Sequence, residues 1–170
     1  GDILFVLSEV AQQIVEELEV MLTPEEVSQI EKVYTANPDA YRFYQKGRYF
    51  CRQRTKTGVE HSIEYLNKAL QLDSAYALAY AGLSDAYFIG AWWGWLAKHD
   101  AIKTSKLFAE KALGIDNNLS DPHAILGGIA CWFECDWKTA KRELERAIEL
   151  NPNNAMAHQY FSEYLDIVNR

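Results

Sequence analysis

The chain has 170 residues, of which 49% are hydrophobic and 24% are charged, and its formal net charge at pH 7 is −7. These values are typical of one globular domain with a packed core and argue against a disordered chain. The excess of acidic residues disfavours nucleic acid and anionic membranes as main partners, because both would repel the protein.

The chain opens with a short apolar run at residues 3–7, far below the roughly 20 residues that a membrane-spanning helix needs. The run lacks the basic flank and the cleavage site of a signal peptide, and the first residue is Gly rather than Met. We therefore expect no membrane insertion, a cytoplasmic location, and a chain that is one part of a longer protein.

Apolar residues recur at helical spacing almost to the end of the chain, and the alternation typical of strands is absent. A first helix is expected over residues 3–22. Thr23, Pro24 and Glu26 then match an N-cap, a first helical position and a capping box, so a second, shorter helix should reach about Tyr34. The sequence predicts an all-α fold that opens with a helical pair.

From residue 40 onward the sequence repeats itself, and the clearest copy is AKRELERAIELNP at residues 140–152. This copy resembles the second half of a tetratricopeptide repeat, a unit of about 34 residues with two antiparallel helices, A and B. Two further copies fit the same frame but carry Ser74 and Asn117 where the family usually has Pro. The resemblance implies a right-handed α-solenoid built from such repeats.

Counting back from each copy places helix A of successive repeats near residues 40, 77, 120 and 155. The array then covers residues 37–170 with about three and a half repeats, and residues 1–36 form the helical pair that links it to an upstream domain. The starts are 37, 43 and 35 residues apart, so each complete repeat carries an insertion between its helices.

Small residues mark the expected contacts between helices A and B. Gly47 and Gly127 fall where a small side chain lets the two helices touch. The last helix, over about residues 155–168, has no helix B, so Phe161 and Leu165 should be exposed. Self-association through this uncapped helix is therefore an expected partner interaction.

The first part of the chain carries a second resemblance. Residues 1–26, AYRFYQKGRYF at residues 40–50 and ALAYAGLSDAY at residues 77–87 look like the C-terminal region of bacterial signalling proteins. In those proteins a tetratricopeptide array follows an adenylate cyclase, a Ser/Thr kinase or a winged-helix module. The resemblance implies a scaffold or regulatory role for this chain, with a protein segment or the upstream effector domain as its partner.

The segment GAWWGWLAKHD at residues 90–100 holds three of the five tryptophans. In the repeat frame it is the insertion between a helix A that ends near residue 89 and a helix B that begins near residue 100. Insertions of this kind often form the binding surface of a solenoid. The alternative is a structural lid over the ends of neighbouring helices, because three exposed tryptophans favour aggregation.

We expect these three rings to divide the two roles. Two should pack inward, and one, Trp93 or Trp95, should stay accessible as a binding anchor. Gly94 should supply the bend between them. A second hypothesis for the whole chain is a small-molecule sensor whose ligand lies between this insertion and the concave groove.

The concave groove of such arrays is lined mainly by helix A. Small residues at positions 81, 124 and 128 should leave room there for a partner segment or for a local side chain. The basic constellation by which some family members hold a peptide carboxylate is absent, which disfavours a receptor for chaperone tails. Further expected lining residues are Leu78, Cys131, Met156, Gln159 and Glu163.

A basic stretch without acidic residues lies between Asp39 and Glu60 and reverses the sign of the net charge locally. Glutamates of the first two helices are expected to neutralise it, and an acidic peptide is the functional alternative. The candidate partner-binding residues are Tyr41, Tyr44, Arg48, Arg52, Asp85, Phe88, Trp92, Trp93 and Trp95.

Neither catalysis nor a cofactor is predicted. The four histidines lie on different expected elements, and no nucleophile motif or phosphate-binding loop is present. Cys51, Cys131 and Cys135 lack the neighbouring ligands of a zinc site and are expected to be buried thiols. The sequence thus favours a non-enzymatic interaction domain without metal.

Overall fold

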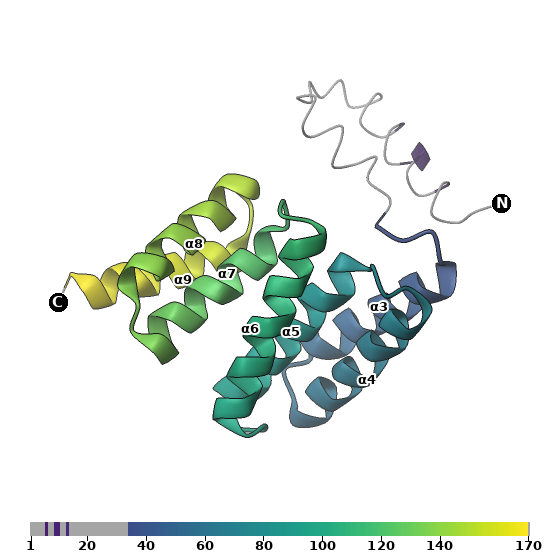
Figure 1. Cartoon of the computed structure of the whole chain (residues 1–170), viewed down its shortest axis with the longest axis horizontal. Coiled ribbons are helices and arrows are strands. Elements are labelled where there is room, and N and C mark those ends of the chain that lie inside the picture. The colour runs from purple at the N-terminus through teal and green to yellow at the C-terminus, as the bar shows by residue number, and fades with distance from the viewer. Residues whose placement is uncertain (1–5, 7–8, 11–12, 14–33, 170) are drawn as a thin grey trace.

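The computed structural model describes residues 6, 9–10, 13 and 34–169. The expected N-terminal helical pair therefore lies almost entirely outside the described residues. Within the described part, seven α-helices and one short π-helix follow one another, and no strand is present (Figure 1). The predicted all-α fold is confirmed.

The helices form hairpins that stack one after another along the long axis of the molecule (Figure 1). The first helix of each hairpin is called an A helix and the second a B helix. The hairpins pair α3 (Pro38–Arg52) with α4 (Lys56–Leu72), α5 (Ala77–Trp92) with α6 (Lys98–Ile115), and α7 (Ser120–Ile129) with α8 (Trp137–Leu150). A π-helix, Ala130–Glu134, extends α7, and the A helix α9 (Ala155–Val168) closes the described chain.

Small residues let the two helices of each hairpin approach closely. A Cβ atom placed on Gly47 of α3 would lie 2.6 Å from Cγ of Leu66 in α4, and one on Gly127 of α7 would lie 2.6 Å from Cγ of Leu144 in α8. In the middle hairpin the hydroxyl of Ser105 donates to the backbone carbonyl of Ser84 at 2.8 Å. The two glycine contacts lie where the repeat frame requires them.

Replacing Gly127 by Leu should lower the free energy of unfolding by about 1–3 kcal/mol, because the added side chain overpacks the contact with Leu144. Gly114 is the matched control, since its missing Cβ faces open space on α6. Gly114→Ala should instead add about 0.5–1 kcal/mol through its higher helix propensity. Urea unfolding of both variants measures this, and parental stability for Gly127→Leu would contradict the contact.

Turns between hairpins use side chains of Asp and Asn. The carboxylates of Asp73 and Asp116 each accept a hydrogen bond from the backbone N–H two residues further on, at 3.0 and 3.2 Å. Asn151 makes the same bond to the N–H of Asn153 at 3.0 Å. Such Asx turns hold the chain in a tight bend without Pro, which explains why Ser74 and Asn117 are tolerated in the repeat frame.

The hairpin of α5 and α6 differs from its expected boundaries. Helix α5 continues to Trp92 and α6 begins at Lys98, so only residues 93–97 connect them. The connection folds back on α5, because the N–H groups of Trp95 and Leu96 both donate to the carbonyl of Gly90, at 2.9 and 3.0 Å. The expected ends near residues 89 and 100 were wrong for this reason.

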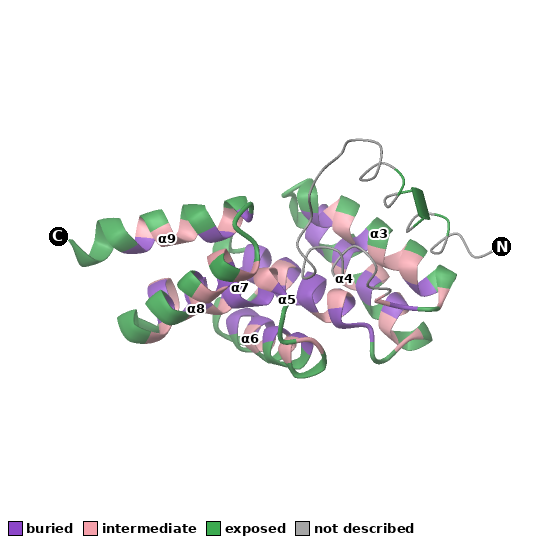
Figure 2. Ribbon diagram, turned by 90° about the horizontal axis from the view of Figure 1, so that it is seen from above, coloured by how far each residue is buried: buried purple, intermediate pink, exposed green. Residues whose placement is uncertain are grey.

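Buried residues gather where neighbouring hairpins face one another, and α5 is buried over most of its length (Figure 2). Ala77, Leu83, Ala86 and Phe88 of this helix are each at most 3% exposed. The last helix is different, since only Ala157 and Tyr164 of α9 are buried. Leu165, Ile167 and Val168 near its end are exposed, while Phe161 is half-buried.

Candidate aromatic binding site

An aromatic pocket of about 340 Å³ lies among the ends of several A helices. Helices α5 and α9 provide most of its lining, and the π-helix after α7 contributes Trp132. The residues that line it are Arg54, Phe88, Ile89, Trp92, Trp93, Trp132, Ala155, Met156, Gln159, Tyr160 and Glu163.

Phe88 lies at the centre of the ring cluster that floors this pocket and is 2% exposed. Its ring centroid lies 5.8 Å from Tyr160, 6.0 Å from Phe133 and 6.3 Å from Trp132. Trp132 and Tyr160 meet edge to face, with centroids 4.8 Å apart and an interplanar angle of 89°. Such edge-to-face pairs are favourable aromatic contacts, so the floor joins α5, the π-helix and α9 into one surface.

The three tryptophans of residues 92–95 match the expectation only in part, since Trp93 is accessible as expected but Trp92 is exposed as well. Trp92 is 48% exposed and Trp93 is 56% exposed, while Trp95 is half-buried. Trp93 stacks on Trp95 with ring centroids 5.9 Å apart, and Trp95 packs against a cluster around Val59. The expectation that two rings pack inward was wrong, because α5 extends far enough to carry Trp92 onto the rim.

Gly94 has φ +70° and makes the turn between Trp93 and Trp95. This left-handed conformation is one that residues with a Cβ adopt only at a cost. The predicted role of Gly94 as the bend of this segment is confirmed.

The π-helix places Trp132 in the pocket and was not foreseen from the sequence. The C-cap of the π-helix is Cys135, which has a left-handed conformation with φ 53°. The N–H of the next residue, Asp136, donates to the carbonyl of Ala130 at 2.9 Å. Lys106 fixes the outer end of the π-helix through an ion pair with Glu134 at 2.6 Å. Single π-turns of this kind are frequent at functional sites.

Two of the three small residues expected to leave room in a groove, Ala124 and Gly128, are covered by other side chains, whereas Ala81 lines a separate cavity. A Cβ on Gly128 would lie 2.7 Å from the ring of Trp132 and 3.2 Å from that of Tyr160, so these rings occupy the space. Ala124 packs beneath α8 and α9, and Cys131 is 1% exposed. The expected groove lining was wrong for Ala124 and Cys131, which lie in the core.

A polar network crosses the A helices beside the aromatic pocket. Arg48 of α3 contacts Asp85 of α5 at 3.4 Å and Asp121 of α7 at 3.6 Å. The thiol of Cys51 donates to the same Asp85 oxygen at 3.5 Å, and Asn154 at the start of α9 donates to Asp121 at 3.0 Å. Arg48 and Asp85, both predicted to bind a partner, thus neutralise each other within the protein.

Burial controls protonation in this network. It raises the pKa of the Asp85 carboxyl, although the nearby Arg48 guanidinium acts in the opposite direction. Burial also raises the pKa of the Cys51 thiol, and the negative charge of Asp85 adds to the effect. Cys51 therefore stays protonated and unreactive near neutral pH.

A second cavity of about 330 Å³, the Tyr44 pocket, is lined in part by Arg48 and Asp121 of this network. Tyr44 and Arg48 line it together with Leu78, Asp121 and Asn151. The ring of Tyr44 packs 5.2 Å from that of Tyr76, and burial raises the pKa of the Tyr44 hydroxyl.

The predicted site residues are thus divided among separate places. Phe88, Trp92 and Trp93 line the aromatic pocket, whereas Tyr44 and Arg48 line the Tyr44 pocket. Asp85 lies in the network with Arg48. The remaining three, Tyr41, Arg52 and Trp95, line neither cavity.

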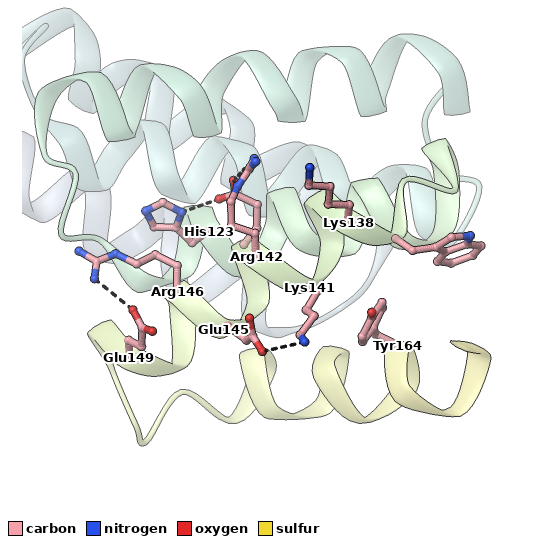
Figure 3. Close-up of a pocket in the computed structure, with 10 residues that line it drawn as sticks. His123, Lys138, Lys141, Arg142, Glu145, Arg146, Glu149 and Tyr164 are labelled. Carbon is pink, nitrogen blue, oxygen red and sulfur yellow. Dashed lines mark hydrogen bonds and ion pairs between the residues drawn. The ribbon is translucent and has the colours of Figure 1, made fainter. Parts of the chain in front are cut away.

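A further cavity, of about 690 Å³, is a shallow charged surface over α8 (Figure 3). Its charges pair with one another, as in Lys141 with Glu145 at 3.7 Å and Arg146 with Glu149 at 3.3 Å. Beneath them His123 contacts Glu143 at 2.7 Å, and this hydrogen bond lowers the pKa of Glu143. Exposed and mutually paired charges describe a solvated helix face better than a binding site.

Two arginines of the basic stretch pair with carboxylates of the described chain. Arg42 pairs with Asp39 at 3.1 Å, and Arg48 pairs with Asp85 and Asp121. The glutamates expected to neutralise the stretch lie outside the described residues. Cys135 is exposed, so the expectation of a buried thiol was wrong there, whereas Cys51 and Cys131 are buried.

The part of the chain that the structure describes contains no group of three His, Cys, Asp or Glu side chains placed to hold a metal ion. Among these same residues, no helix is both long enough and apolar enough to span a membrane.

Comparisons with known proteins identify the fold. No protein-family model and no curated protein matches the sequence. Among solved structures, the chain is similar to the first tetratricopeptide-repeat domain of Spaghetti (RPAP3) bound to the HSP90 peptide SRMEEVD. The TM-score is 0.61 at 16% sequence identity, and the match covers 82% of this chain and 100% of the other. With three stacked hairpins, a further A helix and this neighbour, the chain has the fold of a tetratricopeptide-repeat domain.

Proposed function

We propose that this chain is a protein-interaction module that binds a peptide segment of a partner in the aromatic pocket. The observation that carries the proposal is the pair Trp92 and Trp93, which are 48% and 56% exposed at the rim of a cavity floored by Phe88 and Tyr160. Exposed aromatic rings beside a packed floor are the side chains that most often dominate binding energy.

The similar solved domain holds a peptide, which supports a peptide as the class of ligand. Arg48 already lies between two carboxylates in this chain. A free peptide carboxylate would have to displace one of them, so we propose recognition through the aromatic rings rather than through a chain terminus.

A small-molecule sensor is the second candidate. A cavity of about 340 Å³ lies within the size range of small-ligand sites, and its lining combines aromatic rings with the polar side chains of Arg54, Gln159 and Glu163. Gln159 and Glu163 would then orient the ligand. Saturable binding of one metabolite in a calorimetric screen would favour this function over peptide binding.

The wider context rests on the sequence. The resemblance of residues 1–26, 40–50 and 77–87 to bacterial signalling proteins supports a regulatory scaffold role beside a cyclase, kinase or winged-helix effector in the cytoplasm, with that effector as one candidate partner. We propose no catalytic activity for this chain. The buried thiol of Cys51 is protonated, and His123 and Glu143 are hydrogen-bonded to each other within the protein.

The tryptophan indole signals provide a direct test of peptide binding. The probe is a synthetic copy of the tightest peptide selected on the wild-type protein from a random display library. Its addition should shift the indole N–H resonances of Trp92, Trp93 and Trp132, which line the pocket. The resonance of Trp137 serves as the internal control, because this exposed ring lies over α8 outside the pocket.

Failure to select any peptide, or shifts confined to Trp137, would contradict the proposed function. Assignment of the indole signals follows from single Trp-to-Phe variants, which keep an aromatic ring at each position.

A further inference from the structure

The aromatic pocket carries opposite charges on two separate elements. Arg54 belongs to the connection between α3 and α4, whereas Glu163 belongs to α9. The A helices α5 and α7 lie between these two elements in the stack (Figure 1). The rest of the lining has no charged side chain, so the polarity of the site rests on this pair.

Arg54 is held in an uncommon backbone conformation. Its φ of 48° is left-handed, which few residues other than Gly adopt, and its N–H donates to the carbonyl of Cys51 at 3.2 Å. Arg54 directly follows Gln53, the C-cap of α3, a position where a left-handed residue commonly ends a helix. The exposed side chain lines the aromatic pocket and makes no ion pair with any residue that the structure describes.

Glu163 is half-buried on the α9 wall. It accepts one hydrogen bond, from the amide of Gln159 at 2.9 Å, and within the described chain it has no cationic partner. Gln159 and Glu163 are one helical turn apart, so the bond holds the carboxylate beside Met156 and Tyr160 of the same wall.

The charges of Arg54 and Glu163 both influence the pKa of Tyr160, which lines the same pocket. Burial raises the pKa of the Tyr160 hydroxyl; Arg54 counteracts this rise, whereas Asp85 and Glu163 add to it. Arg54 and Glu163 line the same pocket as Tyr160 but belong to separate elements and do not pair with each other, so a ligand in the pocket can meet both a cation and an anion.

We propose that the aromatic pocket selects a peptide segment in which an apolar anchor lies between an acidic and a basic residue. The anchor packs between Trp93 and the floor around Phe88, the acidic residue pairs with Arg54, and the basic residue pairs with Glu163. This inference rests on the proposed function and adds the charge pattern of the partner to it.

Four fluorescein-labelled peptides test the charge pattern. All share a central Leu-Trp-Leu anchor, and they carry acidic and basic flanks, two acidic flanks, two basic flanks or two neutral flanks. Wild-type protein should bind the mixed peptide about tenfold more tightly than the other three, as two partly exposed ion pairs allow. Fluorescence anisotropy gives the four dissociation constants.

Two charge reversals should change the preference in opposite directions. Arg54→Glu makes both charges of the pocket acidic, so the basic peptide should become the tightest ligand. Glu163→Lys makes both basic, so the acidic peptide should become the tightest. The controls Lys103→Glu and Glu110→Lys make the same changes in net charge on exposed residues of α6 outside the pocket, and they should keep the wild-type preference.

Equal binding of the four peptides by the wild type, or a change of preference in the α6 controls alone, would overturn the charge pattern. If Trp93→Ala still weakens peptide binding about thirtyfold in that case, the proposed function survives without the inference. If no tryptophan variant affects peptide binding either, both fail. Thermal unfolding of each variant confirms that the reversals leave the fold intact.

Discussion

Replacing Arg48 by Ala is expected to lower the free energy of unfolding by about 2–3 kcal/mol. The variant leaves the carboxylate of Asp85 without the guanidinium that lies 3.4 Å from it. Removing one partner of a buried ion pair typically costs about 3–5 kcal/mol. We expect less here, because the Arg48 and Asp85 side chains retain 21% and 17% exposure.

The double variant Arg48→Met/Asp85→Leu separates the charge from the packing. It removes both charges and keeps apolar volume, so its stability should lie close to that of the parent. Asp121 would lose Arg48 as well, but it is 42% exposed and keeps the hydrogen bond from Asn154. Urea unfolding of both variants decides the point, and equal losses in the two would show that Arg48 contributes through packing alone.

The Arg48→Ala defect should also depend on pH. Burial raises the pKa of Asp85 in the folded protein above its unfolded value, so the folded state holds this proton more tightly. The resulting stabilisation is fully present below the unfolded pKa of about 4 and is lost as the pH rises through the folded pKa. Without Arg48 the pKa of Asp85 in the folded protein rises further. The loss in free energy of unfolding caused by Arg48→Ala should therefore be greater at pH 7 than at pH 5. An equal defect at both values would contradict this role of Asp85.

Sequence spacing was sufficient for the fold because the packing of a helical hairpin imposes a short list of requirements. Gly47 and Gly127 lie where helices A and B touch, and their neighbours Leu66 and Leu144 recur at the corresponding places of helix B. Helix ends that depend on local hydrogen bonds were harder to predict from the sequence. The extension of α5 to Trp92 depends on Gly90 accepting two bonds from a connection that folds back onto it.

The sequence predicted only some of the residues that line the aromatic pocket. Phe88, Trp92 and Trp93 were expected to bind a partner and do line one pocket, because Phe88 and Trp92 lie one turn apart on α5 and Trp93 caps the end of this helix. Trp132 and Arg54 were missed. Both depend on backbone geometry that helical periodicity does not reveal, a π-turn for Trp132 and a left-handed residue for Arg54. The one sequence feature that pointed to Trp132 was Gly128, four residues earlier, whose missing side chain leaves room for the Trp132 ring against the helix.

The tryptophan variants should separate binding from folding. Trp95→Ala should lower the melting temperature, because this ring packs on the cluster around Val59. Trp92→Ala should affect both properties, since its ring lies at the exposed rim but also meets Trp132 edge to face, with centroids 5.1 Å apart. Trp137→Ala is the control for loss of an exposed indole, and it should leave peptide binding unchanged.

Trp93→Ala should have the largest effect on binding with the smallest effect on stability. Its ring is 56% exposed, and its recorded ring contact is the stack on Trp95, so its loss should change the free energy of unfolding by only about 0.5–1.5 kcal/mol. A binding anchor of this kind typically contributes about 2 kcal/mol or more, so the dissociation constant of the selected peptide should rise about thirtyfold. Calorimetric titration and thermal unfolding on the same samples measure both quantities. If Trp93→Ala binds the peptide like the parent while Trp95→Ala and Trp92→Ala only melt earlier, residues 92–95 are a structural lid and the pocket is not the binding site.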